Sequence, residues 1–171
     1  MKTLKFKKLN YVVKDKDGNP IVMESKATLP TKAHPTDAGY DLTATRITQE
    51  VDEAGKLILV YHTDLAVEIP EGYVGLLFMR SSVAKKSITL VNAVGCVDCG
   101  YTGEVMLKFK VTTDALPRVY EPGERCAQLV IVPIFDATPE FVEELSETDR
   151  GEGGFGSTDV ANEAEENIQE A

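Results

Sequence analysis

A series of short segments with alternating apolar and polar residues constrains the fold of this 171-residue chain more than any other feature. In "GEVMLKFKVT", the apolar residues Val105, Leu107, Phe109 and Val111 fall on one face. The other face holds Glu104, Met106, Lys108 and Lys110, of which all but Met106 are charged. This period of two predicts a strand with one buried face. Five further segments are short, rich in β-branched or aromatic residues and bounded by turns: "LKFKKLNYVV", "KLILVYHTDLAVEIP", "YVGLLFMR", "SITLVNAVG" and "CAQLVIVPIF".

Helical signals are few, and only "SSVAKKS" and "EFVEELSE" favour helix. Many short strands without long helices between them predict an all-β protein, either an antiparallel sandwich, a jelly roll or a barrel. The segment from Lys14 to Pro35, which contains "KDKDGNP", is interpreted as a hairpin or surface excursion. At this length we expect a single domain, which extends over residues 1–149.

The net charge of −10 is unevenly distributed. Residues 140–171 hold 11 acidic residues and one basic residue, whereas the rest of the chain holds 17 of each. This charge argues against binding to nucleic acid or an anionic membrane surface. No leader and no run of 18 apolar residues is present, so we expect a soluble cytoplasmic protein. The acidic segment 160–171 is predicted to be disordered.

The three cysteines, Cys96, Cys99 and Cys126, are an odd number, which argues for reduced thiols rather than a disulfide framework. The "CVDC" spacing also occurs in zinc and redox sites. A structural zinc ion needs four ligands, however, and few other candidates exist. We therefore interpret these residues as small, partly buried thiols.

Nucleophilic catalysis by serine or cysteine requires a nearby base, usually histidine. His34 and His62 are the only histidines, and neither lies in a recognisable catalytic motif. We expect both to be surface or turn residues. Water is then the favoured nucleophile, and water needs a carboxylate base.

Two aspartates lie in unusual sequence contexts. Asp41 follows a glycine in "TDAGYDLTA", where a turn or cap role and a functional role are equally good interpretations. Asp98 lies in the otherwise apolar "VGCVDCGYTGE". It either caps a hairpin or is held in a pocket, where burial would tune it as a base.

Candidate phosphate ligands are few. Arg80 ends an apolar strand and precedes two serines, a grouping that can bind phosphate, although a simple strand-ending arginine is the alternative. Arg125 is expected to form a structural ion pair with Glu124 or another carboxylate. Gln128 lies in a very apolar strand and needs a specific partner from the protein or a ligand.

Five ordered segments, "DAGYDL", "RSSVAKK", "NAVGCVDCGYTGE", "GERCAQLVIVP" and "RGEGGFGSTD", resemble the five motifs of the homotrimeric dUTPase family. The resemblance runs from about Thr36 to Asp159. It implies a distorted jelly roll, or β-clip, with a flexible C-terminal arm. It also implies the hydrolysis of dUTP to dUMP and pyrophosphate with Mg²⁺, which limits uracil incorporation into DNA and supplies dUMP for thymidylate synthesis.

The resemblance assigns Asp98 as the residue that deprotonates the attacking water and contacts the 3′-hydroxyl. Asp41 supports the water shell of a magnesium ion that the substrate phosphates mainly hold. Tyr101 lies against the deoxyribose and excludes a 2′-hydroxyl, with ordinary core packing as the alternative. The uracil pocket is formed by Asn92, Gly95, Cys96, Val97, Asp98 and Met106, where the main chain of residues 95–98 reads the uracil edge.

The same resemblance implies phosphate contacts from Arg80, Ser81, Ser82 and Gln128, although the family usually has glycine in place of Ser82. The glycine-rich arm, residues 150–159, would close over the site. Asp159 replaces the common glycine at the end of this arm, and a plain linker is the alternative interpretation. The expected arm contacts are stacking of Phe155 on uracil and phosphate binding by Arg150, Gly156 and Ser157.

The homotrimer that the resemblance implies would divide each active site among three chains. Two alternatives stay open. One is an enzyme of the same fold that resembles dCTP deaminase, and the other is a regulatory homologue that uses the nucleotide site as a switch. Tyr101 and the complete fifth motif favour dUTPase over the deaminase.

Overall fold

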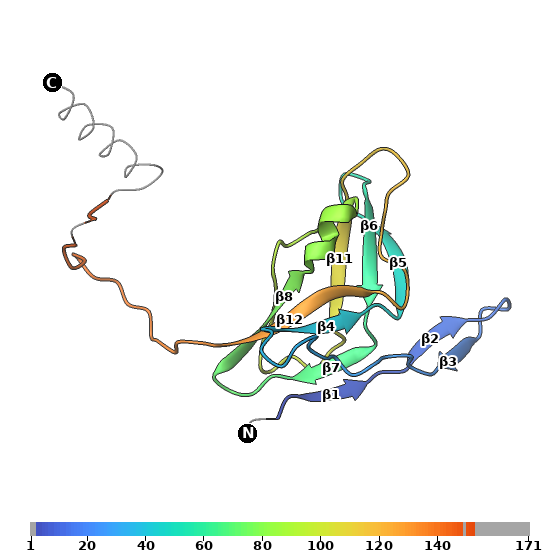
Figure 1. Ribbon diagram of the computed structural model, residues 1–171, viewed down its shortest axis with the longest axis horizontal. Coiled ribbons are helices and arrows are strands. Elements are labelled where there is room, and N and C mark those ends of the chain that lie inside the picture. The colour runs from blue at the N-terminus through green and yellow to red at the C-terminus, as the bar shows by residue number, and fades with distance from the viewer. Residues whose placement is uncertain (1–2, 149, 153–171) are drawn as a thin grey trace. The chain divides into compact units, whose positions relative to one another are not determined.

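The computed structural model describes residues 3–148 and 150–152 and is almost entirely β-structure (Figure 1). Its elements are β1 (Lys5–Lys8), β2 (Tyr11–Lys14), β3 (Pro20–Met23), β4 (Gly39–Thr43), β5 (Arg46–Val51), β6 (Leu57–His62), β7 (Leu65–Glu68), β8 (Tyr73–Met79), the 3₁₀-helix η1 (Ser81–Lys85), β9 (Ile88–Leu90), β10 (Gly95–Val97), β11 (Met106–Val111) and β12 (Arg125–Pro133). The all-β prediction is confirmed.

Two four-stranded antiparallel sheets form the body of the fold. One has the strand order β10-β8-β12-β4 and the other the order β5-β6-β11-β9. Both sheets contribute to one hydrophobic core, since Leu77 and Leu129 come from the first sheet and Tyr61 and Phe109 from the second. Tyr61 and Phe109 pack edge to face with ring centroids 5.1 Å apart. Strand β1 pairs with β7, and β2 pairs with β3.

Strand β11 has the alternation that its sequence predicts. Leu107 and Phe109 are buried in the core, whereas Met106, Lys108 and Lys110 are exposed. The expected face is therefore correct. Because the side-chain period of a strand is two, a shift of one residue would expose the whole apolar set, so the core fixes the register with β6.

The predicted hairpin is also present, although it begins at Tyr11 rather than Lys14. Its turn is stabilised by the Asp15 carboxylate, which accepts hydrogen bonds at 2.8 Å from the backbone amides of Asp17 and Asn19. The amide of Asn19 is the main reason that the pKa of Asp15 lies below its usual value. Gly18 has a φ of 87°, a conformation that favours glycine.

One of the two helix predictions is correct. Helix η1 forms within "SSVAKKS". The prediction for "EFVEELSE" is wrong, because residues 140–147 contain no helix. Four glutamates recur there at spacings of three and four, where like charges disfavour a helix, and an eight-residue helix is marginal without packing.

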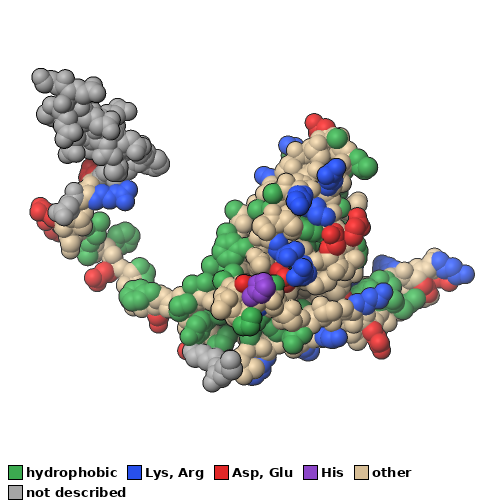
Figure 2. Space-filling view, in the orientation of Figure 1, with side chains coloured by type: hydrophobic (Ala, Val, Ile, Leu, Met, Phe, Trp, Pro, Cys, Tyr) green, Lys and Arg blue, Asp and Glu red, His purple; other side chains and the backbone are tan. Residues whose placement is uncertain are grey.

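Within the described part of the chain, residues up to 136 form one compact unit, and residues 137–148 and 150–152 belong to a second unit. On the visible face of the described chain, acidic and basic side chains are interspersed (Figure 2). No helix within the described residues is long and apolar enough to cross a membrane. The predicted acidic tail, residues 160–171, lies outside the described residues.

Candidate functional site

The first group of candidate residues surrounds the Asp41 carboxylate on the β10-β8-β12-β4 sheet. Arg80 Nε donates to Asp41 Oδ1 at 2.8 Å, and Arg125 Nη1 donates to Asp41 Oδ2 at 2.8 Å. Gln128 Nε2 donates a longer hydrogen bond of 3.4 Å to Asp41 Oδ1. Both oxygens of a buried carboxylate are therefore satisfied by cationic or amide donors.

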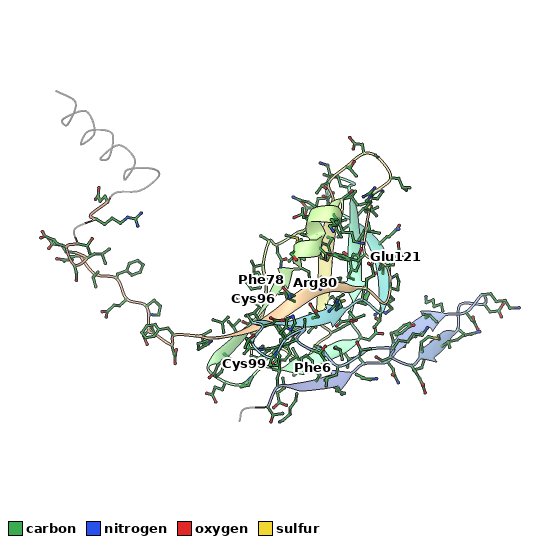
Figure 3. All side chains as sticks on the ribbon, viewed as in Figure 1. Phe6, Phe78, Arg80, Cys96, Cys99 and Glu121 are labelled. Atoms are coloured by element: carbon green, nitrogen blue, oxygen red, sulfur yellow. The ribbon has the colours of Figure 1, made fainter. Side chains whose placement is uncertain are left out.

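The strand order explains how these residues meet. Asp41 of β4 lies directly opposite Gln128 of β12, and Arg80 follows the end of β8 on the other side of β12 (Figure 3). Gly39 lets the strands approach, because a Cβ atom at this position would stand 3.0 Å from the Cβ of Gln128. The close backbone approach that "DAGYDL" predicts is present.

Several expectations can now be compared with this geometry. Asp41 is not a turn or cap residue, since it lies within β4. Arg125 does form an ion pair with a carboxylate, and that carboxylate is Asp41. Arg80 is more than a strand-ending arginine, because its guanidinium group is anchored on Asp41. Gln128 has a specific protein partner, as its apolar surroundings require.

The second group lines a cavity of about 230 Å³ formed by β10, the turn that follows it and β11. The lining includes every residue that the sequence assigns to the uracil and sugar pocket: Asn92, Gly95, Cys96, Val97, Asp98, Tyr101 and Met106. Four residues that the sequence analysis did not assign to the pocket line it as well: Leu77, Glu104, Val105 and Lys108. Lys108 could have been found from sequence, because it shares the outward face of β11 with Met106.

Asp98 directly follows β10 and is exposed. Its backbone carbonyl accepts a hydrogen bond of 3.1 Å from the Tyr101 amide, which closes a turn. Cys96 Sγ donates to Asp98 Oδ1 at 3.7 Å. Desolvation, followed by the charge and hydrogen bond of Asp98, raises the pKa of the Cys96 thiol, so it stays a donor at neutral pH. The expected burial of Asp98 is absent in the single chain.

Tyr101 is 43% exposed, so the alternative of ordinary core packing is wrong. Its hydroxyl donates to the Glu104 carbonyl oxygen at 2.9 Å. Its ring lies against Gly103, where an added Cβ would stand 2.6 Å from the hydroxyl oxygen. The aromatic face is thus presented on the surface, next to Asp98 in the cavity lining.

Ser81 and Ser82, the two other phosphate candidates on the β-sheet unit, join neither group by a described side-chain hydrogen bond. Ser82 Oγ lies 2.9 Å from the Tyr120 hydroxyl, and Ser81 is exposed on η1. Arg150 is exposed in the unit of residues 137–171. Phe155, Gly156 and Ser157 lie outside the described residues.

The remaining cysteine and histidine expectations need correction. Cys96 and Cys99 are exposed rather than partly buried, and they lie apart in Figure 3. Cys126 is buried, and this burial raises the pKa of its thiol to about 12. His34 is exposed as expected, but His62 is buried against Glu104. A strand-end histidine between Tyr61 and Thr63 gave no sequence signal for this polar partner.

Within the described residues, no group of three or more His, Cys, Asp or Glu side chains is arranged to hold a metal ion. No side-chain hydrogen bond joins the Asp41 group to the cavity group in the described chain. The two groups are nevertheless connected through the sheet, since β10 pairs with β8 and β8 pairs with β12.

Comparison with known proteins gives one consistent family. The dUTPase family model matches residues 25–159. Deoxyuridine 5′-triphosphate nucleotidohydrolase from Cutibacterium acnes is 40% identical over 134 residues, which cover 78% of this chain and 86% of the relative. The corresponding protein from Syntrophotalea carbinolica is 44% identical over 137 residues, which cover 80% of this chain and 92% of the relative.

Solved structures give the same result. The dUTPase of Staphylococcus bacteriophage 80alpha, solved with dUpNHpp, has a TM-score of 0.68 and 34% identity, covering 92% of this chain and 98% of its own. A variant dUTPase from phage phi11 of S. aureus, solved to describe the coordination of a structural Mg(II) ion, has a TM-score of 0.61 and 30% identity. That match covers 84% of this chain and 98% of the phage protein.

Proposed function

The chain belongs to the dUTPase family, with its jelly-roll fold, and on this premise we propose that it hydrolyses dUTP to dUMP and pyrophosphate. The observation that carries the proposal is the cavity of about 230 Å³, which brings together the Asp98 carboxylate, the Tyr101 ring and the backbone of β10 that such a reaction needs. The reaction removes dUTP from the pool available for DNA synthesis and supplies dUMP for thymidylate synthesis.

Asp98 is proposed as the general base. Its exposed carboxylate can accept a proton from a water molecule that attacks the α-phosphorus. The new bond joins the water oxygen to this phosphorus, the anhydride bond to the β-phosphate breaks, and pyrophosphate leaves. The Cys96 thiol lies beside this carboxylate and donates a hydrogen bond to its Oδ1.

Uracil selectivity is assigned to the backbone of β10 and its following turn. The amides and carbonyls of residues 95–98 can pair with the uracil edge, and they would face the wrong groups on cytosine. Asn92 and Met106 line the same cavity. Tyr101, with its exposed ring, is placed against the deoxyribose, where it leaves no space for a 2′-hydroxyl.

Arg80 and Gln128, with Ser81 and Ser82, are proposed as triphosphate contacts. Magnesium bound to the triphosphate neutralises phosphate charge. Asp41 would support this metal only through water, because guanidinium groups already contact both of its oxygens.

We place the complete site between chains of a homotrimer. Asp98 and Tyr101 are exposed in the single chain, and the Asp41 group does not reach them by any described side-chain hydrogen bond. A neighbouring chain can therefore bring phosphate ligands to the cavity. The glycine-rich arm, residues 150–159, would close the site with Arg150, Phe155, Gly156 and Ser157.

The test is pyrophosphate release from dUTP, dCTP, dTTP and UTP in the presence of Mg²⁺. We expect turnover of dUTP in strong preference to the other three. Equal cleavage of all four would contradict selective hydrolysis, and release of ammonia from dCTP would indicate a deaminase. Binding of dUTP without turnover would favour the regulatory alternative.

Arg150→Ala is expected to lower kcat/KM for dUTP while leaving the trimer intact, because Arg150 is exposed and assigned to the terminal phosphates. Loss of a charge-assisted phosphate contact should cost about tenfold or more in rate. Light scattering measures the assembly and steady-state kinetics measures the rate. Dissociation of the trimer in the variant would contradict this assignment.

A further inference from the structure

We propose that Glu104 is a positioning residue, held by His62 and Arg46, which fixes the Tyr101 ring and so sets the discrimination between deoxyribose and ribose. The inference rests on the proposed function. It concerns a polar side chain that lines the cavity and that the reaction itself does not use.

The Glu104 carboxylate is held by three donors. Its Oε2 accepts from Arg46 Nη2 at 3.3 Å and contacts His62 Nδ1 at 3.1 Å. Its Oε1 accepts from the Asp64 backbone amide at 2.9 Å. The Glu104 side chain is only 17% exposed, so these contacts are well shielded from water.

The donors are themselves fixed by strand pairing. Arg46 of β5 lies directly opposite His62 of β6. The other ring nitrogen of His62, Nε2, lies 3.0 Å from Thr48 Oγ1, so both ring nitrogens have partners. Arg46 Nε also donates to Asp64 Oδ1 at 3.2 Å. These contacts therefore anchor the Glu104 side chain to residues of the β5-β6-β11-β9 sheet.

Because Glu104 is fixed in this way, its backbone can hold the Tyr101 ring in place. The Glu104 carbonyl oxygen accepts the Tyr101 hydroxyl at 2.9 Å, and Gly103 lies under the ring. Because Tyr101 is 43% exposed, these two contacts, rather than core packing, hold its ring. A ring that excludes one hydroxyl group must be placed accurately, since small misplacements have large effects on rate.

The experiment compares kcat/KM for dUTP and UTP in the full-length protein. Glu104→Gln keeps the size of the side chain, but the amide presents a donor to one of the three donors that surround it. We expect the ratio of kcat/KM for dUTP to that for UTP to fall about tenfold or more. Tyr101→Phe removes only the hydroxyl at an exposed position, so it should fold normally and lower the same ratio.

The matched control is Glu68→Gln on β7, which removes an exposed ion pair with Lys5 of β1 and should leave the ratio unchanged. An unchanged ratio in Glu104→Gln, even with a lower melting temperature, would overturn the inference and leave Glu104 as a stabilising residue. An unchanged ratio in Tyr101→Phe would overturn it as well. A wild-type protein that shows no selective dUTP turnover would instead overturn the proposed function.

Discussion

Asp98→Asn should lower dUTP turnover by about 10²- to 10⁴-fold, the usual contribution of a general base. The amide has nearly the same shape as the carboxylate but cannot accept the proton from water. Asp98 is exposed, so the substitution should not affect folding. Calorimetry should therefore still detect dUTP binding, while pyrophosphate release is nearly abolished.

The control for this experiment is Asp114→Asn, because Asp114 is also exposed but lies in the loop between β11 and β12. Its turnover should match that of the wild-type protein. If Asp98→Asn kept more than about a tenth of the wild-type rate, Asp98 could not be the base, since such a loss is smaller than general-base catalysis supplies.

Asp41→Ala should lower the free energy of unfolding by about 3 kcal/mol, because breaking a buried ion pair leaves the partner charges uncompensated. Asp41 is buried, and it neutralises Arg80, whose side chain is 23% exposed, and Arg125, whose side chain is 52% exposed. Arg125 can turn to water more easily, so the larger cost falls on Arg80. Turnover should fall too, since Arg80 loses its orientation for phosphate.

Urea denaturation at fixed protein concentration measures this effect, because the stability of an oligomer depends on concentration. Asp41→Asn is the informative companion, since it keeps the shape and one acceptor oxygen. We expect it to be destabilised less than Asp41→Ala. Equal stability of Asp41→Ala and the wild-type protein would show that the two arginines do not need this carboxylate.

The local sequence pattern was sufficient to predict features that depend on a single strand or a single turn. The alternation around Phe109 gave the correct buried face, and Gly18 gave a correct turn. The motif order gave the family and the residues that line the cavity. These features depend on neighbours within a few residues or on short contiguous motifs. They can therefore be predicted directly from the sequence.

The wrong expectations concern residues whose surroundings come from distant parts of the chain. His62 was expected at the surface, yet its partner Glu104 is 42 residues away. The helix expected over residues 140–147 failed because helix propensity alone does not stabilise so short a segment without packing. Asp98 lines the cavity as expected but is not buried within the single chain.

By itself, therefore, the sequence determined the all-β class, the inward face of β11 and the set of residues assigned to the nucleotide. Only the tertiary structure decided that Arg125 reaches Asp41 across 84 residues and that Glu104 stands behind Tyr101. The physical reason is that strand register is settled by the packing of both sheets together, and the partners of a buried charge follow from that register.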